Sequence, residues 1–210
     1  MNQFNNQRQR VDNSTIPTVI FALLIANGLF YAFSQMEPNL AYGNFALWPL
    51  ASPYPEFHFW QLLTYGFLHD LRGLAHIGFN MFGLWMFGRD LERMMGAQRF
   101  LIYYLTCVVG AGIVQLIVAG SQGAIYPTVG ASGGVFGILL AFGMAFPNRM
   151  VMLMIPPIPM KAKNMVILFG AMELYFGVSG RSPGVANFAH LGGMLFGFLL
   201  IRYWRKARRR

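Results

Sequence analysis

Two residues in separate apolar segments could together perform acyl-transfer chemistry. Ser132 lies in a G-x-S-G stretch at residues 130–133, and His190 lies near the start of a later apolar segment. A serine hydroxyl is a poor nucleophile alone and needs a neighbouring base to take its proton. An imidazole is the usual base at neutral pH. The plainer alternatives are a small residue at a helix contact for Ser132 and a buried histidine bonded to a carbonyl for His190.

His76 and Asn80 could supply the donors that such chemistry needs. They are four residues apart, so they share one face of a helix, and both side chains can donate hydrogen bonds. With the backbone N–H of Ser132, at an expected helix N-terminus, they could stabilise an oxyanion. The alternative is that the two residues only hold helices together by polar contacts.

The elements that must position these residues are apolar helices. Hydrophobic residues make up 56% of the 210-residue chain and charged residues 11%, against ~25% charged in soluble domains. We therefore predict an all-α, polytopic membrane protein, a bundle of six transmembrane helices. The expected spans are roughly 16–35, 61–88, 98–119, 131–147, 164–180 and 186–204. The expected organisation is an N-terminal tail over 1–15, a six-helix domain over 16–204 and a basic tail over 205–210.

The distribution of charge predicts an orientation. With the N-terminus in the cytoplasm, 14 of the 16 Lys and Arg residues fall on the inner side, and only Arg72 and Arg181 fall outside. The net charge of +9 therefore indicates membrane topology, and we expect no nucleic-acid partner. No A-x-A cleavage site follows the first apolar run, so we interpret it as a retained span. Both termini would be cytoplasmic, in the cell (inner) membrane, and the four polar residues would lie in its outer half.

Small residues predict close contact between the helices that carry the serine and the histidine. Ala189, Gly193 and Gly197 recur every four residues, as do Gly133 and Gly137. Two such stripes let helices pack closely, which would bring Ser132 and His190 within reach of each other. In the inner loop 148–163, three prolines (156, 157 and 159) exclude a continuous helix.

The combined motifs resemble those of the rhomboid proteases. They are H-x-x-x-N at 76–80, G-x-S-G at 130–133, A-H-x-x-G-x-x-x-G at 189–197 and G-x-x-x-E-x-x-x-G at 88–96. The resemblance covers about 16–204. It implies a Ser132–His190 dyad without an acidic third member and a water-filled cavity open to the outside. It also implies cleavage of the transmembrane segments of other proteins near their outer ends. The family often has Trp-Arg where this chain has Trp60-Gln61, and Tyr where it has Phe136.

Other readings of the polar residues remain open. We expect His69 to tie the first outer loop, about 36–60, to the second span, while Glu173 could pair with a polar neighbour or face the cavity. A metal site from His69, His76 and His190 lacks the H-E-x-x-H signature, and we expect no metal or cofactor. The rival functions are a catalytically inactive rhomboid-like binding protein, which usually lacks the serine or the histidine, and a small transporter, which would show internal symmetry.

Overall fold

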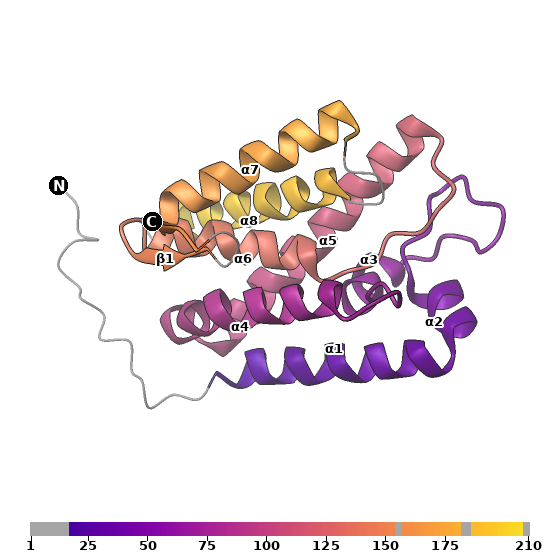
Figure 1. Ribbon diagram of the computed structural model, residues 1–210, viewed down its shortest axis with the longest axis horizontal. Helices are drawn as coiled ribbons and strands as arrows, with labels where there is room; N and C mark the ends of the chain where they lie inside the picture. The colour runs from indigo at the N-terminus through magenta and orange to yellow at the C-terminus, as the bar shows by residue number, and fades with distance from the viewer. Residues whose placement is uncertain (1–16, 154–156, 182–185, 208–210) are drawn as a thin grey trace.

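Six long helices run along a common direction or cross it obliquely (Figure 1). The computed structural model describes residues 17–153, 157–181 and 186–207. The long helices are α1 (Thr18–Met36), α4 (Ala75–Met95), α5 (Ala97–Gln122), α6 (Ser132–Ala145), α7 (Ala162–Ser179) and α8 (Asn187–Ala207). The expected tail over 1–15 lies outside the described residues, and of the basic tail over 205–210 the first three residues continue α8.

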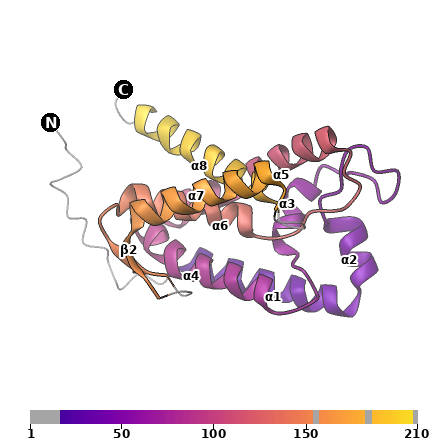
Figure 2. The same cartoon turned by 45° about the horizontal axis from the view of Figure 1, so that its top comes forward.

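The two ends of the bundle carry different connections. At one end, here called the loop end, α4, α6 and α8 all begin (Figures 1 and 2). The short helices α2 (Pro38–Phe45), α3 (Gln61–Thr64) and the 3-10 turn η1 (Tyr65–Phe67) lie there too. At the other end, the hairpin end, α1 begins, α8 ends and the strands β1 (Met150–Met152) and β2 (Pro159–Lys161) pair antiparallel.

The chain is mostly helical, as expected, but the second predicted span is wrong in its bounds. We expected one helix over 61–88, whereas α3 and η1 end at Phe67 and α4 starts only at Ala75. Between them, the Asp70 side chain accepts the backbone N–H of Arg72 at 2.9 Å, a local turn that competes with the helix. The expected span ran through the polar residues His69, Asp70 and Arg72 because the segments on both sides of them are apolar.

Two of the described helices are long and apolar enough to cross a membrane by length and composition alone. They are Thr18–Met36 and Ala97–Gln122, and Ser132–Ala145 is apolar but shorter. The number of six spans therefore stays a prediction. The all-α expectation also missed the β1–β2 hairpin, which occupies the loop where the prolines were expected to stop a helix. Arg149, at the start of the hairpin, pairs with Asp90 of α4 and ties the hairpin to the bundle.

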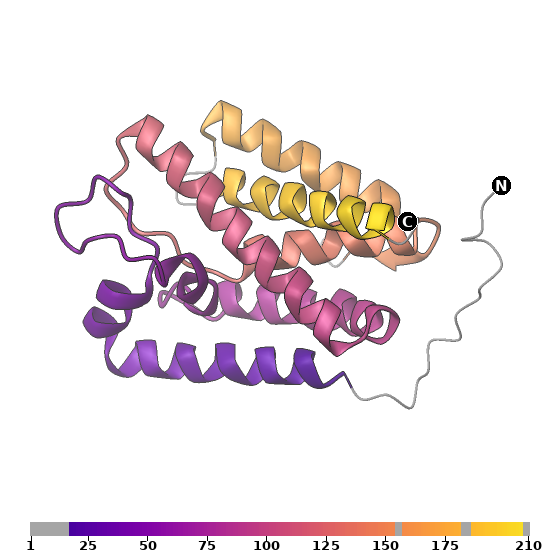
Figure 3. The ribbon, with the colours of Figure 1, turned by 180° about the vertical axis from the view of Figure 1, so that it is seen from behind.

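Helix α5 crosses diagonally over the helices that carry the polar residues (Figure 3). It packs against α6 and α8, where Tyr103, Tyr104 and Cys107 are fully buried. A Cβ on Gly193 would run into the backbone carbonyl of Gly133, so α6 and α8 touch through their main chains. The glycine stripes thus hold the two helices together at Gly133 and Gly193.

The other two stripe glycines contact mainly α5. A Cβ on Gly137 would meet the Cys107 sulfur, and one on Gly197 would meet the Tyr103 hydroxyl. Tyr103 in turn donates to the Gly137 carbonyl at 2.7 Å. We expected the two glycine stripes to contact each other directly along their length. They do so at Gly133 and Gly193, but the remaining glycines of both stripes pack mainly against α5.

The G-x-x-x-E-x-x-x-G stretch joins α1 to α4. The Glu92 carboxylate accepts the backbone N–H groups of Val19 at 2.9 Å and Ile20 at 2.8 Å. These groups have no partner within α1, and a negative charge there also complements the helix dipole. Gly88 leaves room for the Ile20 side chain, and Gly96 adopts φ +84° in the turn into α5. The stretch therefore holds the end of α4 against the start of α1 and sets the turn into α5.

Candidate active site

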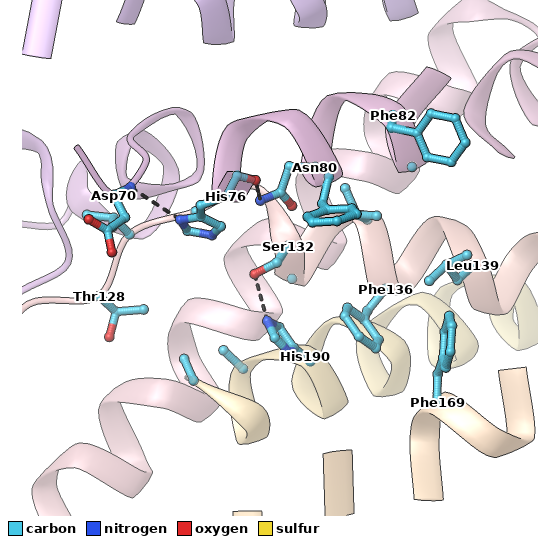
Figure 4. A pocket seen from close by; sticks show the side chains of 18 of the residues that line it. Asp70, His76, Asn80, Phe82, Thr128, Ser132, Phe136, Leu139, Phe169 and His190 are labelled. Atoms are coloured by element: carbon cyan, nitrogen blue, oxygen red, sulfur yellow. Dashed lines mark hydrogen bonds between the residues drawn. The ribbon is translucent and has the colours of Figure 1, made fainter. Parts of the chain in front are cut away.

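The first residue of α6 and the fourth residue of α8 meet at the loop end. The Oγ of Ser132 lies 2.7 Å from the Nε2 of His190 (Figure 4). The main-chain contact between Gly133 and Gly193 brings the two helices close enough for this distance. A serine and an imidazole in direct hydrogen-bond contact are the arrangement in which the base can take the hydroxyl proton.

The His76 ring is oriented by the turn that precedes α4. Its Nδ1 accepts the backbone N–H of Asp70 at 3.2 Å (Figure 4). In a neutral imidazole one nitrogen accepts and the other donates. The Nε2 of His76 therefore carries the hydrogen and is available as a donor at the site.

Gly130 brings the main chain against the His76 ring. It has φ +130°, and a Cβ built on it would lie 2.9 Å from both Cε1 and Nε2 of His76. Glycine is needed on both counts, because other residues rarely adopt this φ and because there is no space for a side chain. The N–H of Gly130 is bonded to the Tyr65 carbonyl at 3.0 Å, which holds the segment leading to Ser132 against η1.

Asn80 lies one turn beyond His76 on the same face of α4, as the spacing predicted. Its Nδ2 donates to the His76 carbonyl at 2.9 Å, and the second N–H of this amide is left for another acceptor. As the first residue of α6, Ser132 has a backbone N–H without an intrahelical partner. The site thus holds three donors from two elements close to one serine hydroxyl.

These groups line one cavity of about 1040 Å³. The polar groups that line it include His76, Asn80, Ser132 and His190, and also Asp70, Arg72 and Thr128. The part of the wall between α4, α6 and α7 is mainly apolar and includes Phe82, Phe136, Leu139 and Phe169 (Figure 4). Such a lining suits a mainly apolar ligand with a few polar groups near Ser132.

The His190 ring is held on its other sides by two residues. Phe136, which stands where the family often has Tyr, stacks on it with ring centres 4.4 Å apart and an interplanar angle of 4°. The Nδ1 of His190 lies 2.9 Å from the Oε2 of Glu173 on α7. The N–H direction is not aligned with this oxygen well enough for a hydrogen bond of good geometry, so the contact is a close electrostatic one.

The turn before α4 carries its own charges. Arg72 holds the pKa of Asp70 down to about 2 through side-chain hydrogen bonds, so this carboxyl is ionised at neutral pH. His69 is fully buried and its ring meets the His76 ring edge-on at 5.1 Å. Burial lowers the pKa of His69 to about 4, with a smaller contribution from His76. The link to the first outer loop is made by the His69 carbonyl, which accepts from Tyr42 at 2.8 Å.

The departure at Trp60-Gln61 leaves the first loop anchored. Gln61 is fully buried, accepts the backbone N–H of Trp48 at 3.2 Å and donates to the Glu56 carbonyl at 3.2 Å. As to metals, His, Cys, Asp and Glu side chains form no cluster of three within the described residues.

Sequence reasoning left Glu173 with two open roles, pairing with a polar neighbour or facing the cavity, and gave Asn187 none. The Nδ2 of Asn187 donates to the Oε2 of Glu173 at 2.7 Å. The available signal was the spacing of Asn187 and His190, three apart and so on the same face of α8, opposite a lone carboxylate in an apolar helix. It indicated neither which partner Glu173 would meet nor where.

Comparisons with known proteins place the chain among similar proteins. The Rhomboid domain family matches residues 56–207. The chain is 35% identical over 140 residues to Rhomboid protease GluP of Bacillus subtilis (strain 168), covering 66% of this chain and 25% of that protein. It is 32% identical over 134 residues to Rhomboid protein 1, mitochondrial, of Saccharomyces cerevisiae, covering 63% and 38%.

A plant protein gives a similar match. RHOMBOID-like protein 4 of Arabidopsis thaliana is 35% identical over 150 residues, covering 67% of this chain and 33% of that protein. The chain therefore spans between a quarter and two fifths of the length of these relatives. The family match covers well over half of the chain, and this protein belongs to the rhomboid family.

Proposed function

We propose that this protein is an intramembrane serine endopeptidase that cleaves transmembrane segments of other membrane proteins. The observation that carries the proposal is the 2.7 Å contact between the Ser132 hydroxyl and the His190 ring. It lies in a cavity whose wall between α4, α6 and α7 is lined mainly by apolar side chains. Relatives of the family support a protease-type function, and both residues required for a Ser–His dyad are present in contact.

The chemistry follows from the geometry. The Nε2 of His190 takes the Ser132 proton while Oγ forms a bond to the carbonyl carbon of the scissile peptide. The negative charge that develops on the carbonyl oxygen is stabilised by the donors of His76, Asn80 and the Ser132 backbone. The C–N bond then breaks, and His190 returns the proton to the leaving amine. A water molecule hydrolyses the resulting acyl-enzyme and frees Ser132.

The exterior of the bundle supports its place in a lipid bilayer, where the rhomboid family is embedded. Large apolar side chains are exposed on separate helices, among them Leu29, Ile117, Ile167 and Leu195. Apolar side chains exposed on several helices of one bundle are suited to contact with lipid tails. We infer that all six long helices span the membrane. Helix α6 is short, and local thinning of the bilayer around it would match its length.

The basic residues support an orientation with the hairpin end in the cytoplasm. Arg149, Lys161 and Lys163 flank the hairpin, and Arg205 and Lys206 end α8. Such residues concentrate on the cytoplasmic side. Both chain termini would then be cytoplasmic and the loop end, with Ser132, would face the extracytoplasmic side. Substrates would accordingly be cut near their extracytoplasmic ends.

The shape of the cavity supports entry of the substrate from the side. Phe79 and Phe82 of α4 line the cavity and are also exposed on the surface, and Phe169 of α7 lines the facing wall. An apolar segment passing between α4 and α7 would reach Ser132 without leaving an apolar environment. It must unwind locally at the reacting bond, since helical hydrogen bonds otherwise shield the peptide carbonyl.

Cleavage of a single-span reporter protein in liposomes tests the proposal. Ser132→Ala and His190→Ala are each expected to abolish cleavage, and Ser121→Ala is the matched control. Ser121 is exposed near the end of α5, and its hydroxyl bonds only to the Val118 carbonyl at 2.8 Å. Cleavage by a folded Ser132→Ala variant at the rate of the control would refute the assignment of the nucleophile.

A further inference from the structure

Glu173 is an acidic residue in the middle of an apolar helix. It lies between Met172 and Leu174 in the sequence of α7, and its side chain is only 14% exposed. A carboxylate in such surroundings is unfavourable unless it has polar partners, so its presence calls for a compensating interaction.

Both polar partners of Glu173 come from α8. Its Oε2 accepts from the Nδ2 of Asn187 at 2.7 Å and lies 2.9 Å from the Nδ1 of His190. The other nitrogen of the same ring contacts Ser132 at 2.7 Å. Carboxylate, imidazole and hydroxyl therefore follow one another in a line that crosses three helices, α7, α8 and α6.

We propose that Glu173 is a positioning residue for His190, so that the site works as a Ser–His–Glu triad and departs in this respect from the dyad without an acidic third member that the resemblance implies. This inference rests on the proposed function. A carboxylate beside Nδ1 keeps the hydrogen on that nitrogen and leaves the Nε2 lone pair free to accept the Ser132 proton. When that proton arrives, the ring becomes positively charged and the carboxylate stabilises it. Glu173 itself takes no proton, and charge balances as an imidazolium–carboxylate pair.

The imperfect alignment of the Nδ1–H bond with the carboxylate fits this role. Hydrogen bonds in catalytic sites are often poorly aligned without substrate and tighten in the reacting complex. Asn187 limits how far the carboxylate can turn, because it bonds to the same oxygen. Phe136 stacks on the His190 ring, so the ring is free to turn mainly within its own plane. A rotation of this kind would improve the alignment of Nδ1–H with the carboxylate.

A purely structural role predicts different behaviour. In that case Glu173 would only clamp α7 to α8 through Asn187, and its loss would alter substrate entry or folding. Glu173→Gln separates the two roles, because the amide oxygen can still accept from Asn187 while the negative charge is lost. Glu173→Asp keeps the charge. Tyr175→Phe is a control on the same helix, since its hydroxyl contacts Arg181 outside the cavity.

The experiment measures kcat and KM for the single-span reporter in liposomes, and the rate of labelling by a fluorophosphonate. The small probe reacts with the serine without needing a transmembrane segment to enter. Glu173→Gln is expected to lower kcat and the labelling rate by about 10- to 100-fold, as for loss of a charge-assisted hydrogen bond. KM should change by less than about twofold, because the carboxylate acts on the transition state. Tyr175→Phe should behave as wild type.

The outcomes separate this inference from the proposed function. Wild-type kcat and labelling in Glu173→Gln, or a loss confined to KM, overturn the triad while Ser132→Ala remains inactive. Activity retained in Ser132→Ala overturns the proposed function itself. If Glu173→Gln does not fold in a thermal unfolding assay, Glu173→Asp decides. A folded Asp variant within about tenfold of wild type supports the triad, and one as inactive as Ser132→Ala overturns it.

Discussion

Replacing Gly130 by alanine would press a methyl group into the ring that we assign to the oxyanion hole. The new Cβ would lie 2.9 Å from Cε1 and Nε2 of His76, whereas the optimal separation of non-bonded carbon atoms is ~3.5–4.0 Å. The ring would have to retreat by roughly 0.5–1 Å. Its Nδ1 is tied to the Asp70 backbone, so the retreat would also strain or break that bond.

Two effects of Gly130→Ala can be separated. Alanine at φ +130° is strained by about 1–3 kcal/mol, which lowers the thermal stability. Displacing the donor by up to ~1 Å is expected to lower kcat by about 10²-fold. Both are measured on protein in the same detergent or liposomes, by thermal unfolding and by reporter cleavage. KM should change little, because the donor acts on the developing oxyanion.

Gly78→Ala is the matched control. Gly78 lies in α4 between His76 and Asn80, and a Cβ there would meet nothing within 4 Å. Alanine in a helix interior is favoured over glycine by about 0.5–1 kcal/mol, so the control should be at least as stable as wild type and fully active. In a His76→Ala background, Gly130→Ala should lose most of its effect on kcat. Full additivity of the two changes would refute the proposed contact.

Three further changes test other parts of the site. Phe136→Leu removes the ring stacked on His190 and should lower kcat by about 2- to 10-fold, measured by reporter cleavage; an unchanged kcat would argue against ring positioning. Asn80→Ala should reduce the cleavage rate less than Ser132→Ala does, by about 10²-fold as for one oxyanion donor, and loss confined to stability would leave Asn80 a structural residue. Burial keeps the pKa of His69 at about 4 against 6.5 when exposed, so the unfolded chain binds an extra proton between these pH values and stability falls as pH is lowered through that window. His69→Phe should therefore flatten the pH dependence of unfolding by up to roughly 3 kcal/mol, and an unchanged slope would contradict the neutral buried ring.

The geometry of the candidate site could be predicted from the sequence where short-range rules apply. The spacing of His76 and Asn80 places them on one face whenever the segment is helical, and the glycines at 133 and 193 leave the main chains free to touch. The contact between Ser132 and His190 follows from that approach. Residues that recur every four positions, and glycines where two helices cross, can both be recognised in a sequence.

The second predicted span failed because its end depends on hydrogen bonds rather than on hydropathy. The segments on both sides of residues 69–72 are largely apolar, but the Asp70 side chain bonds to the Arg72 N–H and the Asp70 N–H bonds to His76. The same break turned out to orient His76. The turn that made the predicted helix boundary wrong is thus also the turn that leaves the Nε2 of His76 as the donor.

Contacts between side chains on different helices were the other feature that the sequence did not predict. Glu92 binds the start of α1, more than seventy residues earlier in the chain, and Glu173 meets Asn187 and His190 across a helix interface. Sequence reasoning recognises that a carboxylate in an apolar helix needs partners, but the choice among them depends on how helices rotate about their axes. That rotation is decided by packing across the whole bundle.

Activation of the Ser132 hydroxyl by His190 underlies the proposed mechanism, and mapping a fluorophosphonate adduct by mass spectrometry tests it. One adduct is expected on Ser132 in the wild type, none in Ser132→Ala, and strongly slowed labelling in His190→Ala. An adduct on another residue, or labelling of His190→Ala at the wild-type rate, would contradict it.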